Sequence, residues 1–281
     1  MPAAAIEPLG PQHLDELKSL LGREPVHNLY LLGLLEEFGI VPRPGRASFA
    51  LHGRFIDGAL TAAVFVGGEG GMLVPSASAP LGISDIAKSL KEKVKPGALL
   101  GEKGCIDAMV TQLAPKATPR LSRTQRLFSV SADDLGPFTN PTLRLAAEAD
   151  LNQLVEMSSG SVKEMLDRDP LEEDPEGFVA RVKQRIKGKR TYVLEAGGRL
   201  VLKIDVGSRS PFGAELEGIY TIPDERRRGH ATLSLGQISR HLLSSLPRLT
   251  LRVDDLDPGL AGVARKVGYV AGRAQRLVLM H

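Results

Sequence analysis

Residues 214–222 alternate in a way that predicts a β-strand. One face of the strand would carry Leu216, Gly218, Tyr220 and Ile222, and the other Glu215, Glu217, Ile219 and Thr221. Pro223 cannot donate to a neighbouring strand, so we expect the strand to end before it. Apolar residues then recur at helical spacing, at Ala231, Leu235, Ile238, Leu242 and Leu246. The pattern predicts a strand, a short charged turn and a helix.

The same order of predicted elements occurs twice along the chain. In the first half we expect strands at 6–9, 48–52, 59–66, 98–100 and 125–130, and helices at 11–21, 28–38, 83–93 and 105–113. In the second half we expect helices at 149–159, 177–187 and 258–267, strands at 191–195, 200–206 and 249–254, and the strand and helix described above. Leu143, Leu151 and Leu154 match Ile6, Leu14 and Leu17 at one constant offset.

The segment Asp133–Pro141 is rich in Asp, Gly, Pro and Asn and predicts a domain boundary. We therefore expect two related lobes, residues 1–138 and 142–281. Each is expected to be an α/β domain with a central, mostly antiparallel sheet flanked by helices. The run LYLLGLL at 29–35 is apolar on nearly all sides, which indicates a helix buried in a core or an interface.

Composition narrows the class of protein. The chain has 281 residues, of which 42% are hydrophobic and 25% charged, and its formal charge is +3. This excess predicts neither a nucleic-acid nor a membrane partner, and no apolar run is long enough to span a bilayer. The single cysteine, Cys105, excludes an internal disulfide and favours a cytoplasmic location. We expect its thiol to be a small core residue and not a nucleophile, and the N-terminus carries no pattern of a secretion signal.

The turn between the predicted strand and helix favours anion binding. It reads Arg226-Arg227-Arg228-Gly229-His230-Ala231. A helix N-terminus offers free backbone N–H groups, and flanking arginines add positive charge. Gly229 lets a phosphate approach the backbone closely because it has no Cβ. The alternative is an ordinary strand–helix connection whose arginines are solvated.

This arrangement, R-x-x-G-x-A after an EL…IYTIP strand, resembles the acyl-CoA signature of the GNAT superfamily of N-acyltransferases. The resemblance covers residues 142–281 well and the first half loosely. It implies that amides of the turn hold the pyrophosphate of coenzyme A and that the strand pairs with the pantetheine arm. The residues so implied are Ile219, Tyr220, Thr221, Arg226, Arg227, Arg228, Gly229, His230, Ala231, Thr232 and Asp257.

The first half lacks an R-x-x-G-x-A turn. Its segment EPVHNLYLLGLLEEFG is similar to the N-terminal lobe of a bacterial group of two-lobed GNAT proteins. The resemblance therefore implies a tandem protein with a degenerate N-terminal lobe, and a closing segment, KVGYVAGRAQRLVLM, that forms the family's final hairpin.

Acetyl transfer to an amine needs a base. An amine with a pKa near 10 is protonated at neutral pH and cannot attack a thioester until a base or a water relay removes its proton. Glu215 and Glu217 share one face of the predicted strand, and either could serve. Glu215 stands where family members carry a catalytic glutamate. The alternative is that both are exposed strand residues. Backbone N–H groups near Ile219–Thr221 could donate to the thioester oxygen.

Two positions depart from the family. Many GNAT enzymes have a tyrosine on the last helix that protonates the departing thiol, and Ala264 stands there. Asp257 replaces the usual asparagine. A thiol of pKa about 8.5 can leave as thiolate without much help, and Tyr192 or Tyr220 could substitute, or could simply be packing residues.

The acceptor site would border the acidic segment 167–176. Its carboxylates could attract a cationic amine, or could belong to a solvated loop: Asp167, Asp169, Glu172, Glu173 and Asp174.

The sequence thus predicts an N-acetyltransferase that transfers an acetyl group from acetyl-CoA to a primary amine by direct attack, without a metal. The alternative is a non-catalytic acyl-CoA-binding sensor or docking module, which the missing tyrosine favours. The acceptor, a small molecule or a protein amine, is not identified by the sequence. The oligomeric state also stays open, a homodimer included.

Overall fold

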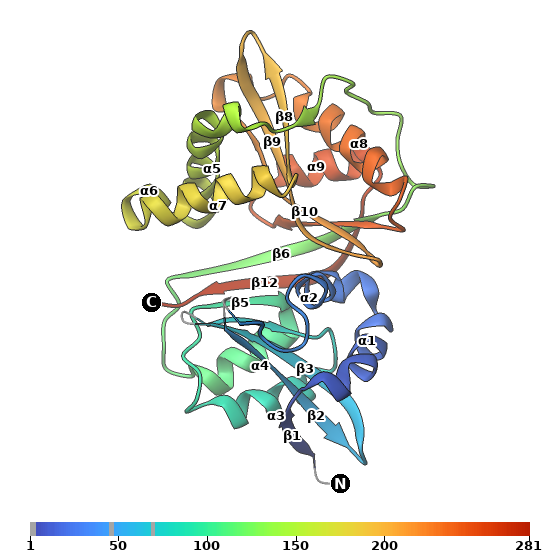
Figure 1. The fold of residues 1–281 in the computed structure, drawn as a ribbon, viewed down its shortest axis with the longest axis vertical. Coiled ribbons are helices and arrows are strands. Elements are labelled where there is room, and N and C mark those ends of the chain that lie inside the picture. The colour runs from blue at the N-terminus through green and yellow to red at the C-terminus, as the bar shows by residue number, and fades with distance from the viewer. Residues whose placement is uncertain (1–3, 45–47, 69–70) are drawn as a thin grey trace. The chain divides into compact units, whose positions relative to one another are not determined.

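The computed structural model describes residues 4–44, 48–68 and 71–281 and divides into two compact units. Unit 1 comprises Met1–Leu127, Arg252–Leu256 and Gly272–His281, and unit 2 comprises Phe128–Leu251 and Asp257–Ala271. Figure 1 shows the course of the chain through both.

Unit 1 is a mixed sheet covered by helices. Its elements are β1 (Ala5–Pro8), α1 (Leu14–Gly22), α2 (Pro25–Phe38), β2 (Phe49–Ile56), β3 (Ala59–Gly67), β4 (Met72–Pro75), α3 (Pro80–Leu90), β5 (Ala98–Glu102), α4 (Lys103–Leu113) and the first part of β6 (Leu121–Val130). Strands β1 to β4 pair antiparallel in sequence order, and β5 runs parallel to β4. Helices α3 and α4 bury Ile83, Ile86, Ile106 and Met109 completely in the core.

Unit 2 repeats this plan. Its elements are β7 (Arg144–Leu145), α5 (Leu151–Leu166), α6 (Pro170–Glu173), α7 (Pro175–Lys187), β8 (Thr191–Ala196), β9 (Arg199–Ser210), β10 (Gly213–Thr221), α8 (His230–Leu243), the first part of β11 (Leu249–Asp254), α9 (Pro258–Val267) and the start of β12 (Val270–Leu279). Strands β7 to β10 pair antiparallel in sequence order, and β11 runs parallel to β10. Helices α5 and α7 lie on one side of β8–β10, and α8 and α9 lie on the other (Figure 1).

The predicted internal repeat is confirmed. Each half of the chain runs strand, two helices, three strands, helix, strand, helix, strand, and the second half adds the short α6 and a 3-10 turn at Pro223–Glu225. In each unit a helix connects the two strands that pair in parallel. The predicted fold class, a mixed α/β fold with mostly antiparallel sheets flanked by helices, is also confirmed.

Two buried features of unit 1 agree with the sequence analysis. Helix α2 buries five leucines, which explains its apolar sequence: Leu29, Leu31, Leu32, Leu34 and Leu35. Cys105 is completely buried in the core, and burial raises the pKa of its thiol to about 12. This thiol is therefore protonated at neutral pH. Among the described residues, no helix is long and apolar enough to cross a membrane.

The closing segment is the clearest departure from expectation. The predicted final hairpin is wrong, because Val270–Leu279 forms one continuous strand, β12. Residues Gln275–Leu279 of β12 pair antiparallel with Ala98–Glu102 of β5, and Val278 is completely buried in the core of unit 1. The last ten residues thus belong to a unit built mainly from the first half of the chain. The compact units therefore do not coincide with a division between 138 and 142.

Candidate functional site

The parallel pairing of β10 with β11 is short. It joins Ala214 to Leu249, Glu215 to Thr250 and Leu216 to Leu251, and no pair beyond Leu216 occurs in the described register. The segment from Glu217 to Thr221 therefore keeps a strand edge that β11 does not cover. The backbone groups of such an edge are available to an extended ligand.

A bulge interrupts β10 within this uncovered segment. Glu217 pairs with Asp205 of β9 and Tyr220 pairs with Lys203, so Gly218 and Ile219 together oppose the single residue between those partners. Gly218 has φ = 55°, a left-handed conformation that suits glycine. The predicted alternation along the whole strand is wrong for this reason. Tyr220 lies on the same face as Glu217, because Asp205 and Lys203 are two residues apart on β9.

Helix α8 begins directly after the turn. Its first residue is His230, one before the first residue of the apolar stripe, and β10 ends at Thr221 ahead of Pro223 as predicted. Gly229 is the N-cap, has φ = 85°, and provides no side-chain cap. The N–H group of Leu233 bonds to the carbonyl of Gly229, so the three preceding amides, from His230 to Thr232, lie before the first helical hydrogen bond. No atom lies within 4 Å of the place of a Cβ on Gly229, which leaves room for a ligand.

The arginines of the turn have different environments. Arg226 donates from Nε to the carbonyl of Thr221 at 2.9 Å and from Nη2 to both carboxylate oxygens of Glu164 on α5, at 2.8 and 2.9 Å. Its guanidinium also lies over the ring of Tyr220, 5.4 Å from the centroid. The Arg226 side chain therefore ties the turn to α5. Its predicted role in cofactor binding stays a prediction.

Arg227 and Arg228 are exposed on the outer side of the turn. Arg227 has φ = 64°, which costs an L-residue about 1–2 kcal/mol. Arg228 forms an ion pair with Glu225 at 2.9 Å, and the ring of His230 lies 3.4 Å from the same carboxylate. Hydrogen bonds from Arg199 lower the pKa of Glu225 further. This carboxylate is thus paired with the guanidinium groups of Arg199 and Arg228 and adds little negative field at the helix terminus.

The two candidate carboxylates have different neighbours. Glu215 is buried, with 3% of its surface exposed, and its Oε2 accepts a hydrogen bond of 3.4 Å from Thr250 of β11. Glu217 keeps 34% of its side chain exposed and accepts a hydrogen bond of 2.6 Å from Arg185 of α7. The alternative that both are exposed strand residues does not hold for Glu215.

The last helix offers no side chain for thiol protonation at the expected place. Ala264 of α9 is completely buried. Asp257 is the N-cap of α9 and accepts a hydrogen bond of 2.8 Å from the amide of Leu260. Its predicted role in cofactor binding is untested, and the structure gives its Oδ1 this capping role.

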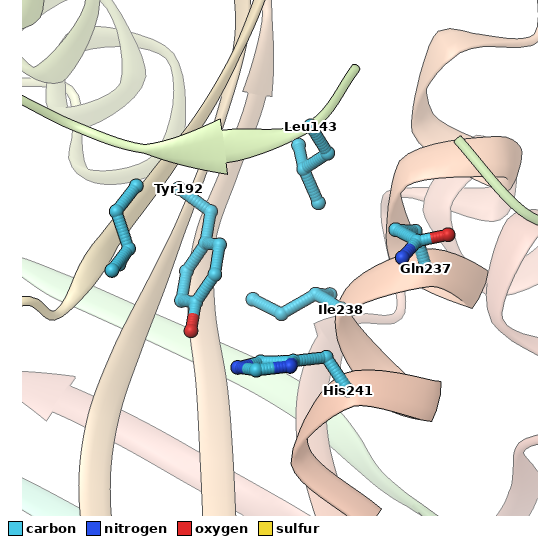
Figure 2. Close-up of a pocket in the computed structure, with 6 residues that line it drawn as sticks. Leu143, Tyr192, Gln237, Ile238 and His241 are labelled. Atoms are coloured by element: carbon cyan, nitrogen blue, oxygen red, sulfur yellow. The ribbon is translucent and has the colours of Figure 1, made fainter. Parts of the chain in front are cut away.

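The two tyrosines considered as substitutes lie apart from each other. Tyr220 points to α5, where its hydroxyl lies 3.4 Å from Glu164, and burial raises its pKa. Tyr192 lines a pocket of about 210 Å³ with Ile238 and His241 of α8, where its ring lies 6.0 Å from the imidazole (Figure 2). Burial raises the pKa of Tyr192 too. The described lining of this pocket contains no residue of the Arg226–Ala231 turn.

The acidic segment between α5 and α7 is structured. Asp169 caps α6 by accepting from the amide of Leu171, and Asp174 caps α7 by accepting from the amide of Gly177. Asp169 also forms an ion pair with Lys163 at 2.6 Å, and the pKa of Asp169 is lowered by it. These two carboxylates stabilise the N-termini of α6 and α7. Their presence is therefore explained without a role in attracting a cationic amine substrate.

In unit 1, the connection equivalent to the Arg226–Ala231 turn has polar groups that are already bonded within the protein. Ser76–Ala79 connects β4 to α3, and the amide of Ala77 donates to Asn28 of α2 at 2.7 Å. The thiol of Cys105 donates to the carbonyl of Ser78 at 3.0 Å. Pro80 is the first residue of α3 and has no N–H group to offer. Asn28 thus occupies one amide of this connection, and Pro80 removes another, so that fewer donors remain for a phosphate.

A buried ionic group beside the bulge is absent from the sequence prediction. Lys203 and Asp205 of β9 are 2% and 6% exposed, and Lys203 Nζ lies 2.5 Å from Asp205 Oδ2. The available signal was the pair of charges inside the otherwise apolar run LVLKIDV. Alternation alone assigns such charges to a solvated face.

Unit 2 therefore combines three features that suit an extended ligand with a negatively charged group: a parallel strand pair that separates early, a bulge on one strand and an uncapped helix terminus after an arginine-rich turn. Solved structures with a similar fold include proteins named as GNAT-family acetyltransferases. The fold matches, over 98% of the chain, a GNAT-family acetyltransferase from Colwellia psychrerythraea with 11% identity, a TM-score of 0.56 and 99% of that chain covered. It matches equally well, with a TM-score of 0.56 and 13% identity over 98% of both chains, a tandem GNAT protein from the clavulanic acid biosynthesis pathway.

A Drosophila protein of known structure is also similar, with a TM-score of 0.71 and 16% identity over 99% of both chains. No protein-family model and no curated protein matches the sequence. The comparisons show that the chain has the tandem GNAT fold, as the sequence motif implied, and that this fold is shared with proteins named acetyltransferases.

Proposed function

We propose that the protein is an N-acetyltransferase that transfers an acetyl group from acetyl-CoA to a primary amine by direct attack. The observation that carries the proposal is the uncapped N-terminus of α8, placed after the strand edge of β10 that β11 leaves uncovered.

The residues of this site fit the donor substrate. Amides from His230 to Thr232, with positive charge nearby, match a pyrophosphate. The edge of β10 from Glu217 to Thr221 matches the amide groups of a pantetheine arm, which can pair with a strand. The open space at Gly229 lets a phosphate reach the backbone. Acetyl-CoA would supply an activated thioester carbonyl.

The chain's own groups then act on the reacting atoms. The free amine attacks the thioester carbon, so that a C–N bond forms and the C–S bond breaks, and the sulfur leaves with the bonding electrons as thiolate. Glu215 accepts the amine proton, directly or through water. The amide of Ile219 in the bulge donates to the carbonyl oxygen, where negative charge develops. No titratable side chain stands at Ala264, and a thiolate of pKa about 8.5 can leave unprotonated.

One observation supports a second candidate, a non-catalytic acyl-CoA sensor. Ala264 is buried and cannot protonate a thiol, and Glu215 is 3% exposed. Such a protein would bind CoA through the same turn and release no thiol.

A thiol-release assay with acetyl-CoA and a panel of amines separates the two candidates. The panel would include polyamines, amino acids, aminoglycosides and lysine peptides, and acetyl-CoA binding would be measured in parallel by calorimetry. Amine-dependent release of CoA thiol is the expected result. Binding without release for any amine would favour the sensor, and absence of binding would contradict both.

A further inference from the structure

Two strongly buried charges lie under the bulge of β10. Lys203 Nζ donates to Asp205 Oδ2 at 2.5 Å and to the carbonyl of Gly218 at 3.1 Å. Asp205 Oδ1 accepts a hydrogen bond of 2.6 Å from the hydroxyl of Thr191 on β8. The ammonium group of Lys203 is therefore fixed between the carboxylate and the bulge.

The ion pair also lies so close to the bulge that only glycine fits at position 218. A Cβ on Gly218 would lie 2.6 Å from Asp205 Oδ2 and 2.9 Å from Lys203 Nζ, closer than side-chain contacts allow. Arg185 of α7 extends the group, 3.6 Å from Asp205 and 2.6 Å from Glu217. Glu217, which precedes the bulge, and the carbonyl of Gly218 within it are thereby held by one set of charges.

Stability alone is a weak reason for such a pair. Removing two charges from water carries a large desolvation penalty, and apolar replacements of buried ion pairs are often neutral or stabilising. Buried charges can instead define a local conformation that an apolar core would leave free. Here the conformation so defined is the bulge at Gly218.

The chemical consequence lies in one peptide group. The carbonyl of Gly218, which accepts from Lys203, belongs to the same peptide unit as the N–H of Ile219. A charge-assisted hydrogen bond to that carbonyl polarises the peptide and strengthens its N–H as a donor. Neither β9 nor β11 supplies a partner residue for Ile219 in the described registers.

We propose that the Lys203–Asp205 pair positions and polarises the Gly218–Ile219 peptide, so that the Ile219 amide donates a strong hydrogen bond to the acyl carbonyl oxygen of the bound thioester. The inference rests on the proposed function, because it concerns the same donor substrate. Lys203 and Asp205 are positioning residues, since they act through the backbone.

Infrared spectroscopy of acetyl-CoA labelled with ¹³C at the acetyl carbonyl tests this without knowledge of the acceptor. A strong hydrogen bond lowers the carbonyl stretching frequency. We expect the band of the complex to lie below that of free acetyl-CoA in buffer. In Lys203→Met the band should return toward the free position, while the dissociation constant for CoA changes less than about threefold, because the proposed phosphate contacts are backbone amides of α8 and do not include Lys203.

Lys163→Met is the matched control. It makes the same substitution in unit 2, on α5, and removes the ion pair of Lys163 with Asp169, the N-cap residue of α6. Its carbonyl band should equal that of the parent. Thr191→Val, which removes the hydroxyl bound to Asp205 and nearly preserves shape, should give an intermediate band and serves if Lys203→Met does not fold.

The outcomes separate the two proposals. If Lys203→Met and Thr191→Val both bind acetyl-CoA and show the same carbonyl band as the parent protein, the positioning role is overturned and the proposed function stays intact. The same conclusion follows if the carbonyl band of acetyl-CoA bound to the parent protein lies at the frequency of free acetyl-CoA. If the parent does not bind acetyl-CoA, the proposed function fails, and this inference fails with it.

Discussion

At the scale of single residues, Glu215 is the group whose role can be tested most directly. Its carboxylate is buried beside Thr250, and Gln matches its shape. Glu215→Gln should keep CoA affinity, because the donor contacts are backbone groups. It should lower the turnover rate by about 10²–10⁴-fold, the usual contribution of a positioned general base. The acidic limb of the rate–pH profile should also disappear. Steady-state kinetics from pH 5 to 9, with calorimetry for CoA, measures all three.

Glu217→Gln is the control for this change. Glu217 is held by Arg185 at 2.6 Å and is partly exposed, so the loss of its charge should reduce turnover much less. Equal losses from the two variants would indicate a shared electrostatic role. No loss from either would contradict the assignment of Glu215 as the base.

At the scale of an element, the N-terminus of α8 defines the donor site. Gly229→Glu places an anion beside the phosphates and a side chain in the open space over the turn. Affinity for CoA should fall at least about tenfold in calorimetry. Gly229 has φ = 85°, and Asn tolerates this region better than most residues, so Gly229→Asn controls for backbone strain. Similar CoA affinity in Gly229→Glu and the parent, with the fold intact, would contradict the site.

The junction of β7 with α5 gives a prediction about pH. Asp150 accepts two hydrogen bonds from Arg144, at 2.7 and 3.0 Å, and one from the amide of Ala147, at 2.7 Å. The bonds from Arg144 and the amide lower the pKa of Asp150. Its stabilising contribution is therefore complete above the ordinary pKa of about 3.9 and is lost as the pH falls through the lowered folded value.

Asp150→Asn should accordingly lower the free energy of unfolding by about 1–2 kcal/mol at pH 7. The difference from the parent should shrink as the pH falls toward 3. Urea unfolding at several pH values measures it. Glu195→Gln removes the exposed partner of the same Arg144 and should cost less than about 0.5 kcal/mol. A pH-independent difference for Asp150→Asn would show that the charge has no part in stability.

At the scale of the whole molecule, only one of the two repeated units should bind the donor. Asn28, Cys105 and Pro80 occupy or remove the polar groups of the turn in unit 1. Calorimetric titration should therefore give one CoA per chain, and Gly229→Glu should abolish that single binding event. A stoichiometry of two, or a second event that survives Gly229→Glu, would contradict a degenerate unit 1.

The sequence alone determined the repeated order of elements, the strand that ends before Pro223 and the helix that follows the arginine-rich turn. These features depend on local chemistry: the period of apolar residues, the missing N–H of proline and the conformational freedom of Gly229. The buried helix α2 and the core position of Cys105 were predictable for the same reason, since apolar surface is removed from water wherever the chain allows it.

The tertiary structure alone decided which groups act together. The bulge at Gly218 changed the face of Tyr220, because two residues there oppose one on β9, and no local pattern specifies a partner strand. Burial of Lys203 and Asp205 depends on Thr191, Arg185 and the bulge, which are distant in sequence. Likewise β12 continues as one strand because β5, far from it in sequence, offers an edge and a core position for Val278. Pairing between distant strands is set by the free energy of the whole fold, which a local pattern of residues does not contain.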